Sequence, residues 1–213
     1  MSIPVIIIPV LNRYDLLENV LESINYPVDN ILIIDNGGEY KTNRDVTVLN
    51  MPGNLGMSAS WNLGIKLYPK SSYWLFASAD TVWGDTALKE IDEHSGPDKL
   101  ILTNDSYGCF SVGENVIEKV GLFDEYFYPI YFEDTDFKER VARFCPENTI
   151  VTTNIQAAPE SGSQTINSDE KLRDRNGETF LKNEEYYKYK MSKNFEISKP
   201  WSLSRRREQE WLR

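Results

Sequence analysis

The segment VIIIPVLNR (residues 5–13) begins as a continuous apolar run and turns polar at its end. Such a run over residues 5–10, rich in β-branched side chains, is typical of a strand buried on both faces of a parallel sheet. Apolar residues at helical spacing follow from Leu16, which predicts a helix with Asn12 as its N-cap. A second buried strand is predicted over residues 31–34. The opening of the chain therefore predicts a strand–helix–strand unit.

The same alternation of short apolar runs and helical patterns continues toward residue 153. Alternating strands and helices predict an α/β fold with a largely parallel, doubly wound sheet, which binds ligands beyond the carboxyl ends of its strands. The further strands are predicted over residues 46–49, 73–77, 100–103, 108–112 and 149–153. The further helices are predicted over residues 57–67, 86–94, 115–120 and 134–144.

Length and composition indicate an ordinary globular protein. The 213 residues suit one large domain with a small appendage, and 40% of them are hydrophobic. The longest apolar run, residues 3–11, is too short to cross a bilayer, and it lacks the flanks of a signal peptide. We therefore expect no transmembrane segment and a cytoplasmic location. The net charge of −10 disfavours a broad nucleic-acid-binding surface.

Cysteine and histidine are too few for several common kinds of active site. Cys109 and Cys145 lack metal-binding spacing, and buried free thiols are the simplest interpretation for a cytosolic chain. The single histidine, His94, falls where a helix is expected to end. One histidine excludes a His-rich zinc site, and the spacing gives no support to a Cys–His nucleophilic pair.

The composition changes beyond the last predicted strand. Residues 159–177 are rich in Ser, Asp, Asn, Arg and Gly, which predicts a mobile loop that serves as a lid or only as a linker. A charged, tyrosine-rich helix is expected over residues 178–191, docked back on the domain. The predicted organisation is a core over 1–155, a mobile loop over 156–177, and a C-terminal helix with a basic tail over 178–213.

Polar side chains follow three of the predicted strands, namely Asn12, Asp35 and Asp80. A carboxylate at Asp35 can accept hydrogen bonds from a base or from ribose hydroxyls, or it can cap its own turn, and the local sequence does not choose between these roles. Asp80 can hold a divalent cation that bridges two phosphates, or it can cap a following helix.

Acidic residues are concentrated where the helix over residues 134–144 begins. Three acids in a first turn interact favourably with the helix dipole, which is the structural interpretation. The functional interpretation is that Asp134 or Glu133 acts as a general base toward an acceptor hydroxyl. Asp136 and Arg140 are four residues apart and are expected to pair along the helix, which leaves Asp134 as the acid available for chemistry.

Five motifs occur in order between residues 3 and 144: a proline-x-x-asparagine-arginine turn over 9–13, Ile33-Ile34-Asp35-Asn36-Gly37, the pair Asn54-Leu55-Gly56 and Asn62-Leu63-Gly64, Gly121-Leu122-Phe123-Asp124-Glu125, and the acidic run over 131–136. In order and spacing they resemble the family-two inverting glycosyltransferases of the GT-A fold. The resemblance implies a Rossmann-like, mostly parallel central sheet flanked by helices, followed here by a C-terminal loop and helix.

The resemblance also implies roles for particular residues. Asp134, beside Glu133, would be the base for single displacement with inversion. Asp80 would reach the metal and the diphosphate of a nucleotide-sugar donor, with UDP as the expected nucleotide. The donor-binding residues implied in this way are Pro9, Leu11, Asn12, Asp35, Asn54, Trp61, Asn62, Ser78 and Asp80.

The metal motif departs from the family pattern. The family usually shows two or three aspartates there, whereas Ser78-Ala79-Asp80 retains one. Many members also carry a histidine ligand after the final strand, and the corresponding segment here has none. Glu160 could replace it as an oxygen ligand, so the resemblance implies Mn²⁺ or Mg²⁺ held by Asp80 and Glu160.

Two other functions stay open at this point. A nucleotidyltransferase shares the architecture, but it usually has a glycine-rich basic loop after the first strand, and residues 10–13 do not form one. A binding module for a nucleotide or sugar, without turnover, is consistent with the depleted metal motif.

The sequence does not identify the acceptor or the oligomeric state. A polysaccharide or lipid-linked glycan, a protein side chain, a small molecule and a hydroxylated DNA base remain open as acceptors. The acidic pI of about 4.7 argues against DNA, whereas the basic cluster over 205–207 with Trp201 and Trp211 favours an anionic or aromatic partner. The tail could also be a solvated end or a contact in a homo-oligomer.

Overall fold

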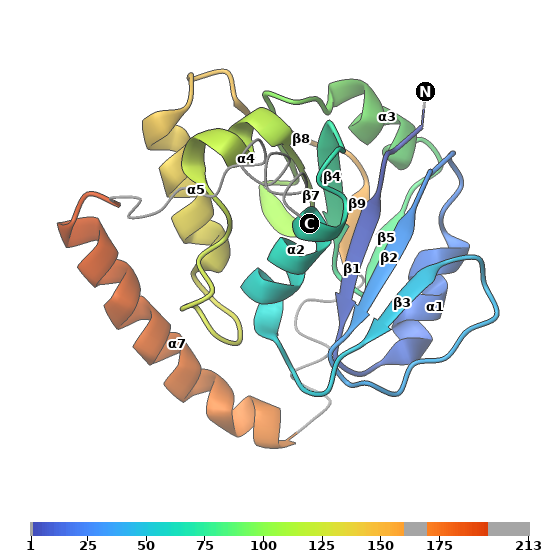
Figure 1. Cartoon of the computed structure of the whole chain (residues 1–213), viewed down its shortest axis with the longest axis horizontal. Coiled ribbons are helices and arrows are strands. Elements are labelled where there is room, and N and C mark those ends of the chain that lie inside the picture. The colour runs from blue at the N-terminus through green and yellow to red at the C-terminus, as the bar shows by residue number, and fades with distance from the viewer. Residues whose placement is uncertain (1, 160–169, 196–213) are drawn as a thin grey trace, which may run out of the picture.

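A computed structural model describes residues 2–159 and 170–195 of the chain (Figure 1). Its main sheet has seven strands in the order β3-β2-β1-β4-β7-β6-β8. The central strand β1 pairs in parallel with β2 on one side and β4 on the other. The strands are β1 (Ile6–Val10), β2 (Ile31–Asp35), β3 (Thr47–Asn50), β4 (Tyr73–Ala77), β6 (Leu100–Thr103), β7 (Ser106–Gly113) and β8 (Ile150–Thr153).

The sheet confirms the predicted α/β fold, with one strand reversed. β7 is antiparallel to both β4 and β6, whereas the other pairs are parallel. The reversal follows a tight turn at Asn104 and Asp105, which both have a φ of 53°. Asn and Asp are the residues other than glycine that adopt this left-handed conformation most readily. A hairpin therefore replaces a crossover at this place in the sheet.

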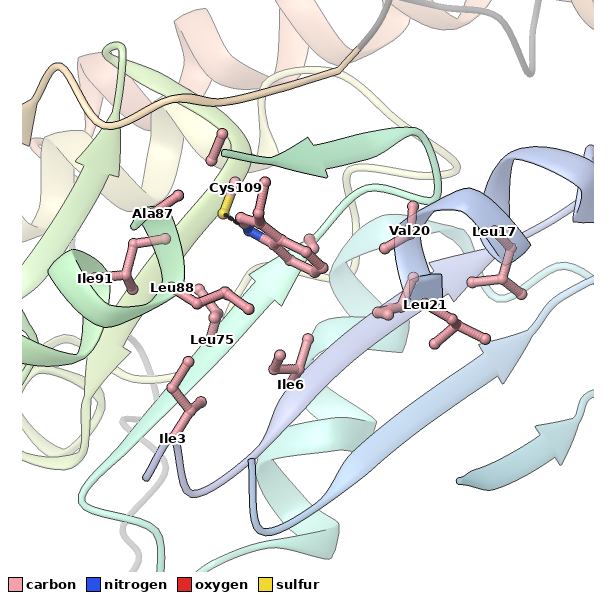
Figure 2. Packing of buried hydrophobic residues seen from close by; sticks show 14 of the residues in the cluster. Ile3, Ile6, Leu17, Val20, Leu21, Leu75, Ala87, Leu88, Ile91 and Cys109 are labelled. Atoms are coloured by element: carbon pink, nitrogen blue, oxygen red, sulfur yellow. Dashed lines mark hydrogen bonds between the residues drawn. The ribbon is translucent and has the colours of Figure 1, made fainter. Parts of the chain in front are cut away.

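Two short strands that the sequence did not predict form a second sheet. β5 (Thr81–Trp83) pairs antiparallel with β9 (Ala157–Pro159). Strands of three residues are too short to show a clear hydrophobic period. The buried indole N–H of Trp83 donates to the thiol of Cys109 at 3.4 Å (Figure 2). The second sheet thus joins the chain after β4 to the last described part of the core.

Alternation along β1 directs side chains to both faces of the sheet. Ile6 and Ile8 belong to one hydrophobic cluster, and Ile7 belongs to the other. Figure 2 shows the first cluster, in which side chains of α1 and α3 pack on the strands. Helices α1 (Tyr14–Glu22) and α3 (Ala87–His94) cover this face, and α2 (Gly56–Leu67), α4 (Glu114–Val120) and α5 (Glu133–Phe144) cover the opposite face.

The start of α1 differs from the prediction. Arg13, rather than Asn12, is the N-cap, and it has a φ of 54° with no side-chain cap. A capping side chain normally requires an extended backbone at that position, which the left-handed Arg13 does not provide. Its guanidinium instead pairs with the carboxylate of Asp15 at 2.7 Å.

The C-terminal helix α7 (Glu170–Ser192) begins eight residues before the predicted start. Residues 170–177 are therefore helical, which corrects the predicted loop over 156–177 at that end, while residues 160–169 lie outside the described residues. The helix lies apart from the sheet, beside α5 and the loop before it (Figure 1). None of the helices in the two described ranges is long and apolar enough to span a membrane.

Candidate active site

The ends of β1 and β2 approach each other closely at the edge of the sheet. Val10 lies opposite Asp35, and the N–H of Asn36 donates to the carbonyl of Val10 at 2.7 Å. A Cβ on Gly37 would lie 2.3 Å from the carbonyl oxygen of Leu11, so only glycine fits there. The Asp-Asn-Gly-Gly turn therefore sets the spacing between the predicted nucleoside-binding residues of the two strands.

Asp35 caps the turn that follows it. Its Oδ1 accepts hydrogen bonds from the Tyr14 hydroxyl at 2.9 Å and the Gly37 N–H at 3.0 Å, and its Oδ2 accepts one from the Tyr40 N–H at 2.7 Å. The side chain is fully buried. The capping role that the sequence left open is therefore present, and a direct contact of Asp35 with a nucleoside stays a prediction.

Two asparagines hold the start of α2. The Oδ1 of Asn36 accepts a hydrogen bond from the backbone N–H of Leu55 at 2.9 Å, and its Nδ2 donates one to Ser60 Oγ at 3.0 Å. Asn54 Oδ1 accepts the N–H of Gly56 at 2.8 Å. Gly56 has a φ of +77°, and a Cβ there would lie 2.8 Å from a carbonyl oxygen of the loop before α5. This glycine therefore permits α2 and that loop to meet at the site.

Ser78 and Asp80 lie in the turn between β4 and β5. The backbone N–H of Ser78 donates to the carbonyl of Gly108 at 2.7 Å, and Ser78 Oγ is 2.9 Å from Thr81 Oγ1. Because strand β5 follows, Asp80 does not cap a helix, and that alternative is excluded. Asp80 is half-buried.

The turn itself supplies one carboxylate to a metal, that of Asp80. The described residues contain no group of three or more His, Cys, Asp or Glu side chains arranged to hold a metal ion. Glu160, the second predicted ligand, lies outside the described residues. Mg²⁺ is commonly bound by one or two carboxylates together with substrate phosphates, so Asp80 fits an ion whose coordination a diphosphate completes.

Trp61 and Asn62 point into the core. Trp61 is 3% exposed, and its ring lies 4.8 Å from Phe123 and 5.1 Å from Phe110, centroid to centroid. The Asn62 amide holds the backbone of Phe123, donating to its carbonyl at 2.8 Å and accepting from its N–H at 3.0 Å. Both side chains are buried, and a donor-binding role for either residue stays a prediction. Trp61 packs on the segment that leads to α5, and Asn62 is hydrogen-bonded to its backbone.

Glu133 and Asp134 occupy the first turn of α5 in different environments. Glu133 is 4% exposed, and its Oε2 has no hydrogen-bond partner among the described residues. Burial, with the nearby charge of Asp134, raises the pKa of Glu133 to about 8, so its carboxyl is mostly protonated at neutral pH. Asp134 is half-buried, and its Oδ1 accepts the Thr135 N–H at 2.6 Å. Asp134 is thus the more accessible carboxylate.

A charge cluster attaches α7 to α5. The predicted pair is present, with Arg140 Nε 2.8 Å from Asp136 Oδ2 and both side chains buried. Lys190 of α7 adds a second cation, its Nζ 2.5 Å from Asp136 Oδ1 and 2.7 Å from Asp124 Oδ2. Burial opposes ionisation of Asp124, but the bonds from Lys190 outweigh it, and the pKa of Asp124 is lowered. The helix is therefore fixed to the Gly-Leu-Phe-Asp-Glu motif as well as to α5.

Further contacts join α7 to the loop before α5. Asn183 Nδ2 donates to the carbonyls of Ile130 and Tyr131, at 2.8 and 3.1 Å. The ring of Phe180 packs on those of Tyr131 and Phe132, with centroids 5.5 and 5.0 Å apart. All of these contacts involve side chains of α7, and they complete one wall of a cleft.

The cleft has a volume of about 1260 Å³ and lies between the sheet edge and α7. One wall consists of the ends of β1 and β4 and the start of α2, and the other consists of α7 and the loop before α5. The cleft brings together the predicted donor residues Pro9, Leu11, Asn54, Ser78 and Asp80. Among the described residues, its lining does not include Asn12, Asp35, Trp61, Asn62, Glu133 or Asp134.

A family comparison covers the same part of the molecule. The sequence pattern of the family described as Glycosyl transferase family 2 matches residues 5–135. The match runs from β1 through all of the donor-side motifs and ends one residue after Asp134. The chain belongs to glycosyl transferase family 2. A search of curated proteins finds no match.

Solved structures share the fold of this family 2 member at low sequence identity. A fragment of S. aureus TarS spanning residues 1–349 is 17% identical with a TM-score of 0.53, and the match covers 72% of this chain and 58% of that one. Glucosyl-3-phosphoglycerate synthase from Mycobacterium tuberculosis is 12% identical with a TM-score of 0.59, covering 75% and 72%. The chain thus spans little more than half of the TarS fragment. These similarities show the GT-A fold.

The cleft includes residues to which the sequence assigned no role. On the wall formed by α7 and the loop before α5 they include Tyr126, Tyr128, Lys182, Tyr186 and Tyr189. A signal was present in the density of aromatic residues over 126–132 and in the tyrosine-rich pattern of the last helix. What the sequence lacked was the register of α7, which decides which of its faces meets the cleft.

Proposed function

We propose that this glycosyltransferase transfers the sugar of a UDP-sugar to an acceptor hydroxyl by a single displacement with inversion. The supporting observation is one cleft that joins the donor-side residues of β1, α2 and β4 and borders the loop leading to Asp134. The similar synthase was solved with Mn²⁺ and UDP-glucose, and the TarS fragment with UDP. These ligands support UDP as the nucleotide.

In this proposal the sheet edge holds the nucleotide. Pro9 and Leu11 border the nucleoside, with Asn12 and Asp35 behind them. Asn54 and Ser78 line the same wall of the cleft and contact the rest of the donor. Because Asn36 and Gly56 fix the loops that carry these residues, the wall is formed before the ligand arrives, which reduces the entropic cost of binding.

Asp80 would hold the divalent cation against the diphosphate, with Glu160 proposed as a second oxygen ligand. A bound Mn²⁺ or Mg²⁺ neutralises charge on the leaving diphosphate. Asp80 lines the cleft on the turn after β4, close in sequence to Ser78. One described carboxylate predicts weak metal binding without nucleotide and tighter binding with it, because the diphosphate supplies the remaining oxygens.

Asp134 would accept the proton of the acceptor hydroxyl. The hydroxyl oxygen then forms a bond to the anomeric carbon, and the bond from that carbon to the diphosphate breaks on the opposite face. The glycosidic product has inverted configuration, the proton is on Asp134, and the leaving group is UDP. Glu133 next to it, protonated near neutral pH, supports the site without competing as a second anion.

A thermal-shift titration tests the donor assignment. UDP, GDP, CMP and TDP are each added with and without Mn²⁺ to the full chain. A nucleotide that binds the folded state raises its apparent stability by RT ln(1 + [L]/Kd). UDP with Mn²⁺ is expected to raise Tm the most, and Asp80→Asn to remove the part that depends on the metal.

Asp85→Asn is the matched control, because Asp85 is exposed, lies five residues beyond Asp80, and loses the same charge. The assignment fails if UDP produces no shift, or if Asp80→Asn and Asp85→Asn behave alike. Release of pyrophosphate instead of UDP during turnover would indicate a nucleotidyltransferase. Binding of UDP-sugars without transfer or hydrolysis under any condition would indicate a binding module.

A further inference from the structure

Four tyrosines line the side of the cleft formed by α7 and the loop before α5. Tyr126 and Tyr189 are 70% and 58% exposed, and the ring of Tyr186 lies 4.2 Å from the first and 6.4 Å from the second, centroid to centroid. Tyr128 is 53% exposed, and its hydroxyl donates to the carbonyl of Asn54 at 3.1 Å. These four rings, called here the tyrosine platform, therefore reach from α7 to the donor wall.

The platform is held in place by the charge cluster beneath it. The Tyr186 hydroxyl donates to Asp124 Oδ2 at 3.0 Å, and Lys190 pairs with the same oxygen at 2.7 Å. Burial and the charge of Asp124 raise the pKa of Tyr186, so its hydroxyl stays protonated as a donor. The arrangement of the central ring is thus fixed before a ligand arrives, which favours binding.

The side chains around the platform are polar and balanced in charge. Two are cationic, two are carboxylates, and three are amides or hydroxyls, all of them on α7. The opposite charges cancel, and Asp80 on the facing wall adds a negative charge. These residues are Arg175, Lys182, Glu178, Glu185, Asn176, Thr179 and Asn183.

We propose that the tyrosine platform binds a sugar ring at the end of a neutral glycan acceptor, a proposal that rests on the glycosyltransferase function above. A pyranose presents a face of C–H groups and a rim of hydroxyls. Exposed tyrosine rings supply rigid apolar area for that face at a low cost in side-chain entropy. Carboxylates and amides such as Glu185 and Asn176 can bond the rim. The shared cleft would direct a rim hydroxyl toward the donor.

The charges of the cleft favour a neutral glycan over a polyanion. Nucleic-acid bases also stack on aromatic rings, but their binding sites combine the rings with a positive groove that follows the phosphates. Here Arg175 and Lys182 are offset by Glu178 and Glu185, and the whole chain carries a net charge of −10. A phosphate-rich acceptor would therefore meet no net attraction at the platform.

Saturation-transfer NMR on the full chain with UDP and the diamagnetic ion Mg²⁺ tests this site. The probes are the methyl β-glycosides of glucose, galactose, mannose and N-acetylglucosamine, with glycerol phosphate and a thymidine hexamer as anionic probes. At least one neutral glycoside is expected to receive saturation on its ring protons. Tyr189→Ala and Tyr126→Ala should weaken its Kd roughly tenfold, which is the order of one aromatic contact. Tyr189→Phe should retain the binding.

Leu181→Ala is the control, because Leu181 is 65% exposed on the same helix and does not line the cleft. UDP binding, measured by thermal shift, should be equal in all variants. Unchanged glycoside binding in both alanine variants, or no glycoside binding while UDP binds, overturns the platform proposal. Preferential binding of an anionic probe that the alanine variants abolish overturns it as well. Absence of UDP binding instead contradicts the proposed function, so the two failures are distinguishable.

Discussion

The two walls of the cleft are built in different ways. The donor wall consists of strand ends, and the backbones of those strands are paired in a ladder with side chains such as Ile7 and Ile8 fully buried around it. The α7 wall is attached to the core through side chains, by Lys190, Asn183 and a set of aromatic rings. One wall is therefore inseparable from the fold, while the other depends on a few replaceable contacts.

This difference fits the separate roles proposed for the two walls. In the proposed function the nucleotide binds at the sheet edge, where the paired strands fix the geometry. An acceptor site must differ between enzymes of one fold, and a docked helix can change without disturbing the ladder. Asp134 lies in the first turn of α5, the helix to which α7 is attached, and is not among the residues that line the cleft. The predictions below test this division, from the largest expected effect to the smallest.

Asp134→Asn is expected to lower the rate of transfer by about 10²- to 10⁴-fold, the usual contribution of a general base. Binding of UDP should be unchanged, because the donor wall does not include this residue. Initial rates of UDP release and a UDP titration measure the two quantities. Glu139→Gln, on the same helix and paired with exposed Arg143, should retain the rate. An equal loss in both variants would contradict the role of Asp134.

Ile8→Ala is expected to lower the free energy of unfolding by about 2–5 kcal/mol, because it leaves a cavity in the first hydrophobic cluster. Urea unfolding measures the loss. Since β1 is paired within the main sheet, UDP binding and the protection of all strand amides from hydrogen exchange should weaken together. A milder Ile8→Val variant, with a cost of about 0.5–1.5 kcal/mol, keeps the test usable if the alanine variant does not fold. A loss of hydrogen-exchange protection that is confined to α7 would contradict the view that β1 is inseparable from the rest of the fold.

Lys190→Met is expected to cost about 1–3 kcal/mol, because it leaves the carboxylates of Asp124 and Asp136 without their shared cation. Hydrogen exchange should become faster in α7 and stay slow in β1 and β2. Lys188→Met is the control, since Lys188 is 64% exposed and forms a surface pair with Glu184. Equal acceleration across the sheet would show that α7 is not a separately attached wall.

Glu133 predicts a pH dependence of stability. Its pKa is about 8 in the folded state, against an ordinary value of 4.5, so between these pH values the folded state holds a proton that the unfolded state has lost. The contribution of Glu133 to the free energy of unfolding is fully present below pH 4.5 and is lost as the pH rises toward 8. The slope of the free energy of unfolding is at most about 1.4 kcal/mol per pH unit. Urea unfolding from pH 5 to 8 should show a flatter profile for Glu133→Gln. Identical profiles would contradict this assignment.

Most of the fold could be predicted because its signals are local. The buried strands appear as apolar runs, and the predicted bounds of β1, β4 and β6 match the structure within a residue. The reversed direction of β7 is set by a turn at Asn104 and Asp105, which apolar patterns do not report. The short β5 and β9 are held by pairing over a long sequence distance, so their residues show no strand period.

The candidate site could be predicted only in part from strand ends. Asp80, after β4, lines the cleft, whereas Asn12 and Asp35, at the ends of β1 and β2, do not. The carboxylate of Asp35 is buried and accepts hydrogen bonds within its own turn, which an apolar pattern does not report. On α2, the motif spacing did not show which way a side chain points. Trp61 and Ile65 are four residues apart and lie in the same buried cluster, and this helical spacing was the signal for a core position.

The attachment of α7 has an evolutionary consequence. Positions 183, 186 and 190 bind the core, so substitutions there would release the helix. Positions 182, 185 and 189 line the cleft without any described bond to the sheet, and they recur at the same helical interval. Selection can therefore alter the second set one residue at a time while the first set stays constant. A lineage with this fold could acquire new acceptors gradually, without a loss of donor chemistry along the way.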